Sequence, residues 1–393
     1  MNCLHTARGK KQLCFTYLAF MMNGLLALSL GSLLPFIRES RGLNYAFAGL
    51  IVSLHSVGNL ISSFTAGILS VAIGRKRSIL LFNTCFALSY LLIIFGTNNL
   101  CLALAFFMTG LARGASSNFA NATVNDLAPG KASVLNGLHA MFSIGAFSFP
   151  IFLTILTRAD ANRWILACYC MALMGVLSWL LYFMIPASAE KKEKKEKGES
   201  SFGFFREPLF YLCTFTLFFY LCAEQGVIGW LITYFVDTGL LSDSLSQLMA
   251  SVLWIMILAG RLTSAWAAER VRKERLLLAM GVGFVFFFFW LLLGRNTMFI
   301  VIGIMGFGYS MAGIYPTTVS FSGKLIQKYS MAWSFILTIA SLGSILMPTV
   351  IGRIAERAGI ASGMSSVAAV VLIDLALIVL LNVYIKRERQ ENV

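Results

Sequence analysis

A carboxylate lies inside one of the most apolar stretches of the chain. The segment FFYLCAEQGVIGWLITYF, residues 218–235, places Glu224 beside Gln225. Two arginines, Arg113 and Arg261, also interrupt apolar runs. An ionised side chain in the middle of a bilayer costs at least about 2.5 kcal/mol unless it is paired or faces water. These charged residues therefore either form ion pairs that stabilise the fold or serve as groups that bind substrate, exchange a proton or form a gate.

Neutral polar side chains occur in the same apolar runs. Amide and imidazole groups donate and accept hydrogen bonds in fixed directions, which suits a site for a small solute with many hydroxyl groups. The spacing of Asn118, Asn121 and Asn125 places them on one face of a helix. Hydrogen bonding between helices is the alternative role for each residue. The candidates are Asn23, His55, Asn59, Asn118, Asn121, Asn136, His139, Glu224, Gln225, Trp230 and Tyr315.

The composition indicates which elements position these residues. The 393 residues are 58% hydrophobic and 12% charged, and the mean hydropathy is +0.80, far above the value of a soluble domain. Apolar runs of about 20 residues, enough to cross a hydrocarbon core of roughly 30 Å, recur along the chain. We predict an all-α membrane protein with about twelve spans near 13–37, 46–70, 78–96, 100–122, 133–156, 164–185, 207–236, 246–268, 275–293, 297–320, 329–351 and 362–385.

The depth of the charged residues follows from these spans. At 1.5 Å per residue, Glu224 lies about 18 Å from the outer end of its helix, and Arg113 and Arg261 lie about 20 Å from theirs. All three therefore lie near the middle of the membrane. Glu224 can pair with Arg261 within its own half of the chain or with Arg113 across the halves. Asp374, in the last span, is expected to be structural.

The distribution of positive charge predicts the topology. The net charge is +14, and most of the 31 Lys and Arg residues fall in alternate connections between the spans. The positive-inside rule then places both termini in the cytoplasm of a multi-pass protein of the cell membrane. The charge therefore reports topology, and we expect no nucleic-acid partner.

A polar run and an internal repeat divide the chain into two halves. The run PASAEKKEKKEKGESS, residues 186–201, cannot form a buried core. We predict an N-terminal six-helix bundle over 1–186, a cytoplasmic linker over 187–206 and a C-terminal six-helix bundle over 207–393. Residues 198 positions apart match between the halves: Ser143 and Ser341, Gly145 and Gly343, Pro150 and Pro348, and Gly110 and Gly308. Parallel repeats of six helices are typical of transporters with a midplane substrate site.

The sequence resembles the major facilitator superfamily. The segment GILSVAIGRKR is similar to the family signature G-x-L-x-D-R-x-G-R-K-R, which acts as a conformational loop motif. The matching residues are Gly67, Leu69, Gly74, Arg75, Lys76 and Arg77, and Val71 replaces the acid. In the second half, AWAAERVRKER keeps Glu269 and Arg270 at the equivalent spacing.

Within that superfamily the chain is most similar to the fucose permease and sodium-dependent glucose transporter branch. The segments that carry this resemblance are NFANATVNDLAPG, LNGLHAMFSIGAFSFP, FFYLCAEQGVIGWLITYF, LWIMILAGRL and GIYPTTVS. The resemblance implies that Asn136 and His139 form a polar pair and that Glu224 faces the substrate. Two acids of the branch are replaced by Gly31 and Ser117, which puts inherited proton coupling in question.

The function predicted from the sequence is secondary active transport of a sugar or related hydroxylated solute by alternating access. Its predicted partners are this substrate, the bilayer and H⁺ or Na⁺ as co-substrate, and we expect a monomer without metal or cofactor. The alternatives are an exporter of amphipathic compounds, favoured by the two missing acids, and a non-transporting membrane sensor or scaffold. Catalytic motifs such as G-x-S-x-G and H-E-x-x-H are missing from the sequence, so we do not expect an enzyme.

Overall fold

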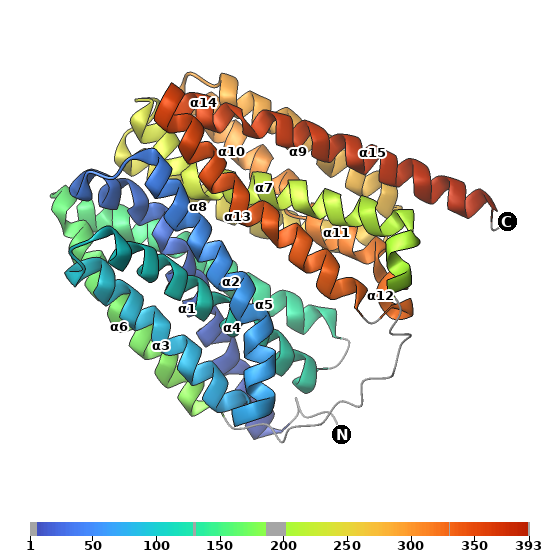
Figure 1. Cartoon of the computed structure of the whole chain (residues 1–393), viewed down its shortest axis with the longest axis horizontal. Helices are drawn as coiled ribbons and strands as arrows, with labels where there is room; N and C mark the ends of the chain where they lie inside the picture. The colour runs from blue at the N-terminus through green and yellow to red at the C-terminus, as the bar shows by residue number, and fades with distance from the viewer. Residues whose placement is uncertain (1–5, 129–130, 186–201, 330, 392–393) are drawn as a thin grey trace. The chain divides into compact units, whose positions relative to one another are not determined.

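The computed structural model describes residues 6–128, 131–185, 202–329 and 331–391, and over these residues it consists of helices without β-strands (Figure 1). Within these described ranges, twelve stretches are long and apolar enough to cross a membrane, which confirms the predicted all-α membrane fold. The helices are α1 (Ala7–Arg41), α2 (Tyr45–Ile73), α3 (Arg75–Phe95), α4 (Asn99–Leu127), α5 (Ala132–Thr157), α6 (Trp164–Met184), α7 (Pro208–Asp237), α8 (Asp243–Ala268), α9 (Lys273–Leu293), α10 (Thr297–Met311), α11 (Ile314–Phe321), α12 (Gly323–Lys328), α13 (Ala332–Ala358), α14 (Ile360–Ser365) and α15 (Val367–Glu391), with short 3₁₀ turns η2 (Ala161–Arg163) and η3 (Phe202–Arg206).

Two predicted spans are interrupted. The last one, over 362–385, is divided at Ser366 between α14, which ends at Ser365, and α15, which begins at Val367. The sequence predicts a single helix over 297–320, whereas α10 ends at Met311 and α11 begins at Ile314. Pro316 has no N–H to donate to the carbonyl of Ala312, so one hydrogen bond of the helix is missing at the point where α10 and α11 separate. This interruption therefore has a local cause in the sequence.

The positions of some helix ends also match between the two halves of the chain, at the same offset of 198 residues. Asn98 and Asn296, 198 positions apart, cap α4 and α10, and their side chains accept hydrogen bonds from Cys101 N and Phe299 N, both at 2.9 Å. An asparagine at this position satisfies an amide group that the helix itself leaves unpaired. The helices α3 and α9 are 21 residues long and begin at residues 75 and 273, again 198 apart. The internal repeat therefore extends to element boundaries.

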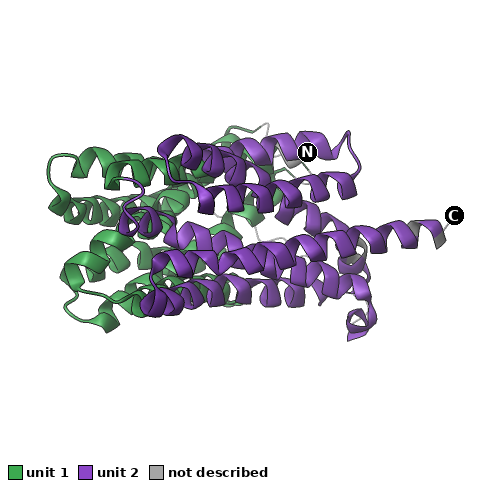
Figure 2. Cartoon of the chain, turned by 90° about the horizontal axis from the view of Figure 1, so that it is seen from above, with its two compact units in different colours: residues 1–190, 242–254 green, residues 191–241, 255–393 purple. Residues whose placement is uncertain are grey.

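The chain forms two compact units (Figure 2). Unit 1 comprises residues 1–190 and 242–254, and unit 2 comprises residues 191–241 and 255–393. The first half of α8 belongs to unit 1, where Gln247 Nε2 donates to the carbonyl of Ser32 at 2.8 Å and Ser251 Oγ donates to that of Phe147 at 2.9 Å. The predicted bundles over 1–186 and 207–393 differ from these units, because the prediction placed residues 242–254 in the C-terminal bundle. Most of the predicted linker, residues 187–201, lies outside the described residues.

Glycines allow close approach of helices inside each unit. In unit 1, a Cβ at Gly145 of α5 would lie 1.9 Å from the carbonyl oxygen of Met21 in α1. In unit 2, a Cβ at Gly343 of α13 would lie 2.2 Å from the carbonyl oxygen of Phe218 in α7. Gly145 and Gly343 are the residues that the offset of 198 pairs, so they occupy equivalent contacts in the two units.

Large apolar side chains lie on the surface of the helices. Val71 is 88% exposed and Leu293 is 75% exposed, and many other leucines, isoleucines and phenylalanines are exposed as well. A soluble protein seldom exposes so much contiguous apolar surface. Exposed apolar side chains of this kind suit helices whose outer surface contacts lipid.

Candidate functional site

Arg113, in the middle of α4, lies in a polar cluster of unit 1. Its Nη1 is 3.2 Å from His55 Nε2 on α2, and its guanidinium lies 5.9 Å from the centre of the Phe142 ring. Asn23 of α1 is completely buried, and its Nδ2 donates to the carbonyl of Arg113 at 3.4 Å and to Ser117 Oγ at 3.3 Å. The structure thus brings together Asn23, Arg113 and His55, three residues that were only separate candidates in the sequence analysis.

The close approach of α2 and α4 makes the His55–Arg113 contact possible. A Cβ at Gly110 of α4 would lie 2.0 Å from the carbonyl oxygen of His55. A residue larger than glycine would therefore separate the two helices next to the arginine. Because the arginine is always a donor, His55 Nε2 must accept in this contact, and the imidazole is neutral.

The remaining polar residues of α4 and α5 differ in exposure. Asn121 is half-buried and its Nδ2 donates to the carbonyl of Ser117, one turn earlier, at 2.8 Å. Asn136 is exposed, and His139 is half-buried with its ring edge-to-face to Phe20 at 5.8 Å. Asn118 is exposed, and its Nδ2 donates to the carbonyl of Ser63 at 2.9 Å. Their assignment as substrate-binding residues stays a prediction.

Glu224 is the buried carboxylate in the middle of α7. It is 8% exposed, and its Oε1 accepts a hydrogen bond of 2.9 Å from Tyr220 OH, one turn earlier on the same helix. The Tyr220 and Tyr315 rings are 6.3 Å apart, and Tyr315 lies close enough to Glu224 for an electrostatic interaction. Among the described residues of unit 2, no cation lies within ion-pair distance of Glu224. The predicted alternative partner in this unit, Arg261, is thus not paired with it in this conformation.

Sequence reasoning missed Tyr220. It lies four residues before Glu224, a spacing at which two side chains meet on the surface of a helix, so this signal was present in the sequence. Pairing of Glu224 with Arg113 would join the two units and stays a prediction.

Two other candidates on α7 have different surroundings. Trp230 is completely buried, and its indole Nε1 donates to the carbonyl of Pro348 in α13 at 3.0 Å. In this conformation the indole packs one helix against another. Gln225 is half-buried and remains a candidate for contact with a solute.

The loop motif between α2 and α3 contains a turn and an ion pair. Gly74 has a φ of +88° and joins the two helices directly, a conformation that glycine adopts at low cost. Arg75 Nη1 pairs with Asp126 Oδ2 at the end of α4. The acid missing at Val71 therefore has a counterpart 51 residues beyond Arg75, which the spacing of the motif could not identify.

The other motif residues lie at the surface. Lys76 Nζ is 5.0 Å from the centre of the Phe183 ring, whereas Gly67 and Arg77 are exposed. An open crevice of about 280 Å³ is lined by residues of α2, α3 and α4, among them Arg75 and Asn118. In unit 2, Arg270 lies over the Trp266 ring at 4.3 Å, and Glu269 is exposed.

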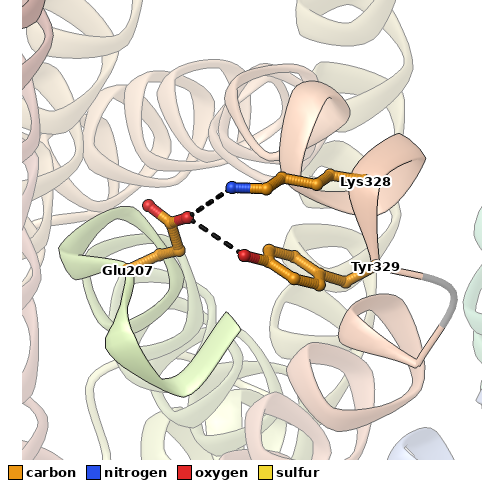
Figure 3. Close-up of polar contacts among 3 residues, drawn as sticks. All are labelled: Glu207, Lys328 and Tyr329. Carbon is orange, nitrogen blue, oxygen red and sulfur yellow. Dashed lines mark hydrogen bonds and ion pairs between the residues drawn. The ribbon is translucent and has the colours of Figure 1, made fainter. Parts of the chain in front are cut away.

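A second polar contact lies at the start of α7 (Figure 3). Glu207, the residue before this helix, accepts hydrogen bonds at its Oε1 from Lys328 Nζ at 3.0 Å and from Tyr329 OH at 3.2 Å. The Lys328 ammonium group holds the pKa of Glu207 below its usual value, and Tyr329 acts in the same direction. This contact ties the start of α7 to the last residue of α12 and to the residue that follows it.

The described residues contain no group of three His, Cys, Asp or Glu side chains that could hold a metal ion.

Comparisons of the sequence and of the structure with known proteins agree on one family. The family model described as Major Facilitator Superfamily matches residues 15–348. An uncharacterized MFS-type transporter of Yersinia pestis is 23% identical, with 93% of this chain and 94% of that protein covered. The glucose/mannose transporter GlcP of Bacillus subtilis is 22% identical, with 96% of this chain and 95% of that protein covered. The solved structure of a bacterial homologue of the human lysosomal transporter Spinster superposes with a TM-score of 0.75 at 13% identity, covering 96% of this chain and 97% of that one.

Proposed function

Because the chain belongs to the major facilitator superfamily, whose members are membrane transporters and not enzymes, we propose that it carries a small polar solute across the cell membrane. The solute is a sugar or a related hydroxylated compound, and transport is secondary active by alternating access. The similarity to a glucose/mannose transporter over almost the whole chain supports this solute class.

The observation that carries the proposal is the Tyr220–Glu224 pair in α7. A carboxylate that is 8% exposed inside an apolar helix is costly, and Tyr220 stabilises it without neutralising its charge. A carboxylate that accepts hydrogen bonds suits the hydroxyl groups of a sugar. The same group can also take up a proton or meet Na⁺, so Glu224 is the proposed coupling residue.

Unit 1 contributes amide and imidazole groups in the proposal. Asn121, Asn136 and His139 are at least partly accessible, and the cluster of Asn23, Arg113 and His55 lies in the same unit. Unit 2 contributes Gln225 and Tyr315 beside Glu224. We assign no stacking role to Trp230 in this conformation, because its indole N–H is bonded to Pro348.

Substitution of Glu224 by glutamine tests the coupling role. The amide keeps the size of the side chain and accepts the Tyr220 hydrogen bond, so we expect the protein to fold and bind its solute. It cannot change charge, so accumulation driven by a proton or sodium gradient should be lost. The measurement is uptake of labelled glucose, mannose and other sugars into proteoliposomes with and without each gradient.

The matched control is Glu207→Gln, which removes a carboxylate from the start of the same helix and should leave accumulation intact. If Glu224→Gln accumulates solute as well as the wild type does, Glu224 is a structural residue. If no sugar is taken up but amphipathic compounds are expelled, the proposed solute class is wrong.

Substitution of His139 by phenylalanine tests the polar residues of α5. Phenylalanine keeps the edge-to-face contact with Phe20 but removes both ring nitrogens. We expect normal expression and thermal stability with loss of solute uptake. Unchanged uptake kinetics would exclude His139 from the binding site.

A further inference from the structure

Asp374 is a buried carboxyl group that the proposed transport mechanism does not use. It lies in α15, eight residues from the start of that helix, and none of its surface is exposed. Neither of its carboxyl oxygens has a hydrogen-bond partner among the described residues. It differs in this respect from Glu224, whose Oε1 accepts from Tyr220.

The groups around Asp374 offer it no positive charge. The helix α15 packs against α7, α9 and α14. On α7, Tyr220 and Cys222 lie close enough to Asp374 to interact electrostatically, and Glu224 is held by the same Tyr220. The charged groups of α9, namely Lys273, Glu274 and Arg275, lie in its first turn, and α14 contains no titratable side chain.

The donors near Asp374 are already in use or weak. Tyr220 has one hydroxyl proton, and it is directed to Glu224. The Cys222 thiol is a weak donor. Arg261 also acts electrostatically on Tyr220, but among the described residues it does not lie within ion-pair distance of Asp374. An ionised Asp374 would therefore be a bare negative charge inside an apolar helix packing, an arrangement that proteins avoid.

A proton removes this difficulty. When an O–H bond forms between a proton and one carboxylate oxygen, Asp374 becomes neutral, and no redox chemistry or other leaving group is involved. Asp374 and Glu224 both act electrostatically on Tyr220, so the two carboxyl groups would also repel each other if both were ionised, and a proton on Asp374 removes this repulsion.

We propose that Asp374 is a proton-binding site within unit 2, occupied in this conformation. Its ligand is H⁺, and it is separate from the site proposed for the solute. The bound proton couples folding of unit 2 to pH and sets the charge next to the Tyr220–Glu224 pair.

Thermal unfolding as a function of pH tests the proposal without any substrate. The unfolded chain releases this proton above about pH 3.9, the usual value for aspartate, whereas the folded protein keeps it. The folded wild type should therefore lose stability, relative to an Asp374→Asn variant that binds no proton there, as the pH rises. The ratio of the two folding constants should change about tenfold for each pH unit between pH 5 and 8.

The matched control is Asp126→Asn, which alters an exposed aspartate that pairs with Arg75. Because this carboxylate is exposed and paired with a cation, we expect the ratio of the wild-type and Asp126→Asn folding constants to be independent of pH between pH 5 and 8. The proposal would be overturned if the ratio of the wild-type and Asp374→Asn folding constants did not change with pH, or changed in the opposite direction.

Infrared spectroscopy supplies a second measurement that does not depend on stability. The wild type at pH 7 should show the C=O stretching band of a protonated carboxylic acid, and Asp374→Asn or Asp374→Leu should lack it. A wild-type spectrum without that band, or a band that persists in both variants, contradicts the assignment. Neither experiment involves transport, so its failure would leave the proposed function untouched.

Discussion

Replacement of Gly145 by alanine tests the contact between α1 and α5. The new Cβ would lie 1.9 Å from the carbonyl oxygen of Met21 and 2.8 Å from the amide nitrogen of Leu25. Ordinary contact begins at 3.4 Å, which is 1.5 Å more than the 1.9 Å available. Both atoms belong to the backbone, so no side-chain rotation can relieve the clash and the helices must separate.

The magnitude follows from two opposing effects. Overpacking a close contact costs about 1–3 kcal/mol, and α1 also packs on α4 and α6, which prevents it from moving freely. Alanine gains up to about 1 kcal/mol over glycine in a helix interior. We therefore expect Gly145→Ala to lower the free energy of unfolding by about 1–2 kcal/mol, measured as a lower midpoint of thermal unfolding in detergent.

A matched glycine substitution without a clash should not lower the midpoint of thermal unfolding. Gly67 lies inside α2, and a Cβ there would meet nothing within 4 Å. Gly67→Ala should leave the midpoint unchanged or raise it, since only the helix propensity changes. If both variants shift the midpoint by the same amount in the same direction, the close approach of α1 and α5 is wrong, and with it the equivalence to the Gly343 contact.

Two further predictions concern α7. Glu207→Gln should lower thermal stability slightly at pH 7. Because Lys328 holds the pKa of Glu207 below its unfolded value of about 4.3, this loss of stability should shrink as the pH falls below about 4.3 and disappear only below the lower pKa of the folded state. An equal effect at pH 3 and 7 would contradict this prediction. Trp230→Phe should cost about 1–3 kcal/mol because it removes the hydrogen bond to Pro348, whereas Trp266→Phe, at a residue 60% exposed, should cost less than about 0.5 kcal/mol; equal midpoints for the two variants would refute the packing role.

Most of the fold could be predicted because the bilayer limits the alternatives. A span must be apolar over a fixed length, so hydropathy alone located the twelve segments. The offset of 198 was visible at Gly145 and Gly343, and the structure extends it to the capping residues Asn98 and Asn296. The interruption between α10 and α11 was missed, although Pro316 supplies a local reason for it.

The partners of polar residues were harder to predict. Tyr220 and Glu224 lie one helical turn apart, so their hydrogen bond could have been read from spacing. Arg75 and Asp126 are 51 residues apart, and only the packing of α3 on α4 brings them together. The role of Trp230 likewise depends on where α13 places the Pro348 carbonyl. Sequence spacing identifies neighbours within one helix, whereas contacts between helices require the tertiary structure.

Glu207, the residue before α7, and Glu224, in the middle of that helix, have different partners. Glu207 lies outside the apolar segment and meets a lysine ammonium group, so its charge is neutralised and its contact fixes the start of the helix. Glu224 lies in the middle of the helix and meets a phenol, which satisfies a hydrogen bond but leaves the negative charge in place. A group that must respond to a solute, a proton or Na⁺ needs a charge that can still change. The phenol partner of Glu224, in contrast to the cationic partner of Glu207, therefore agrees with the coupling role that we propose for Glu224.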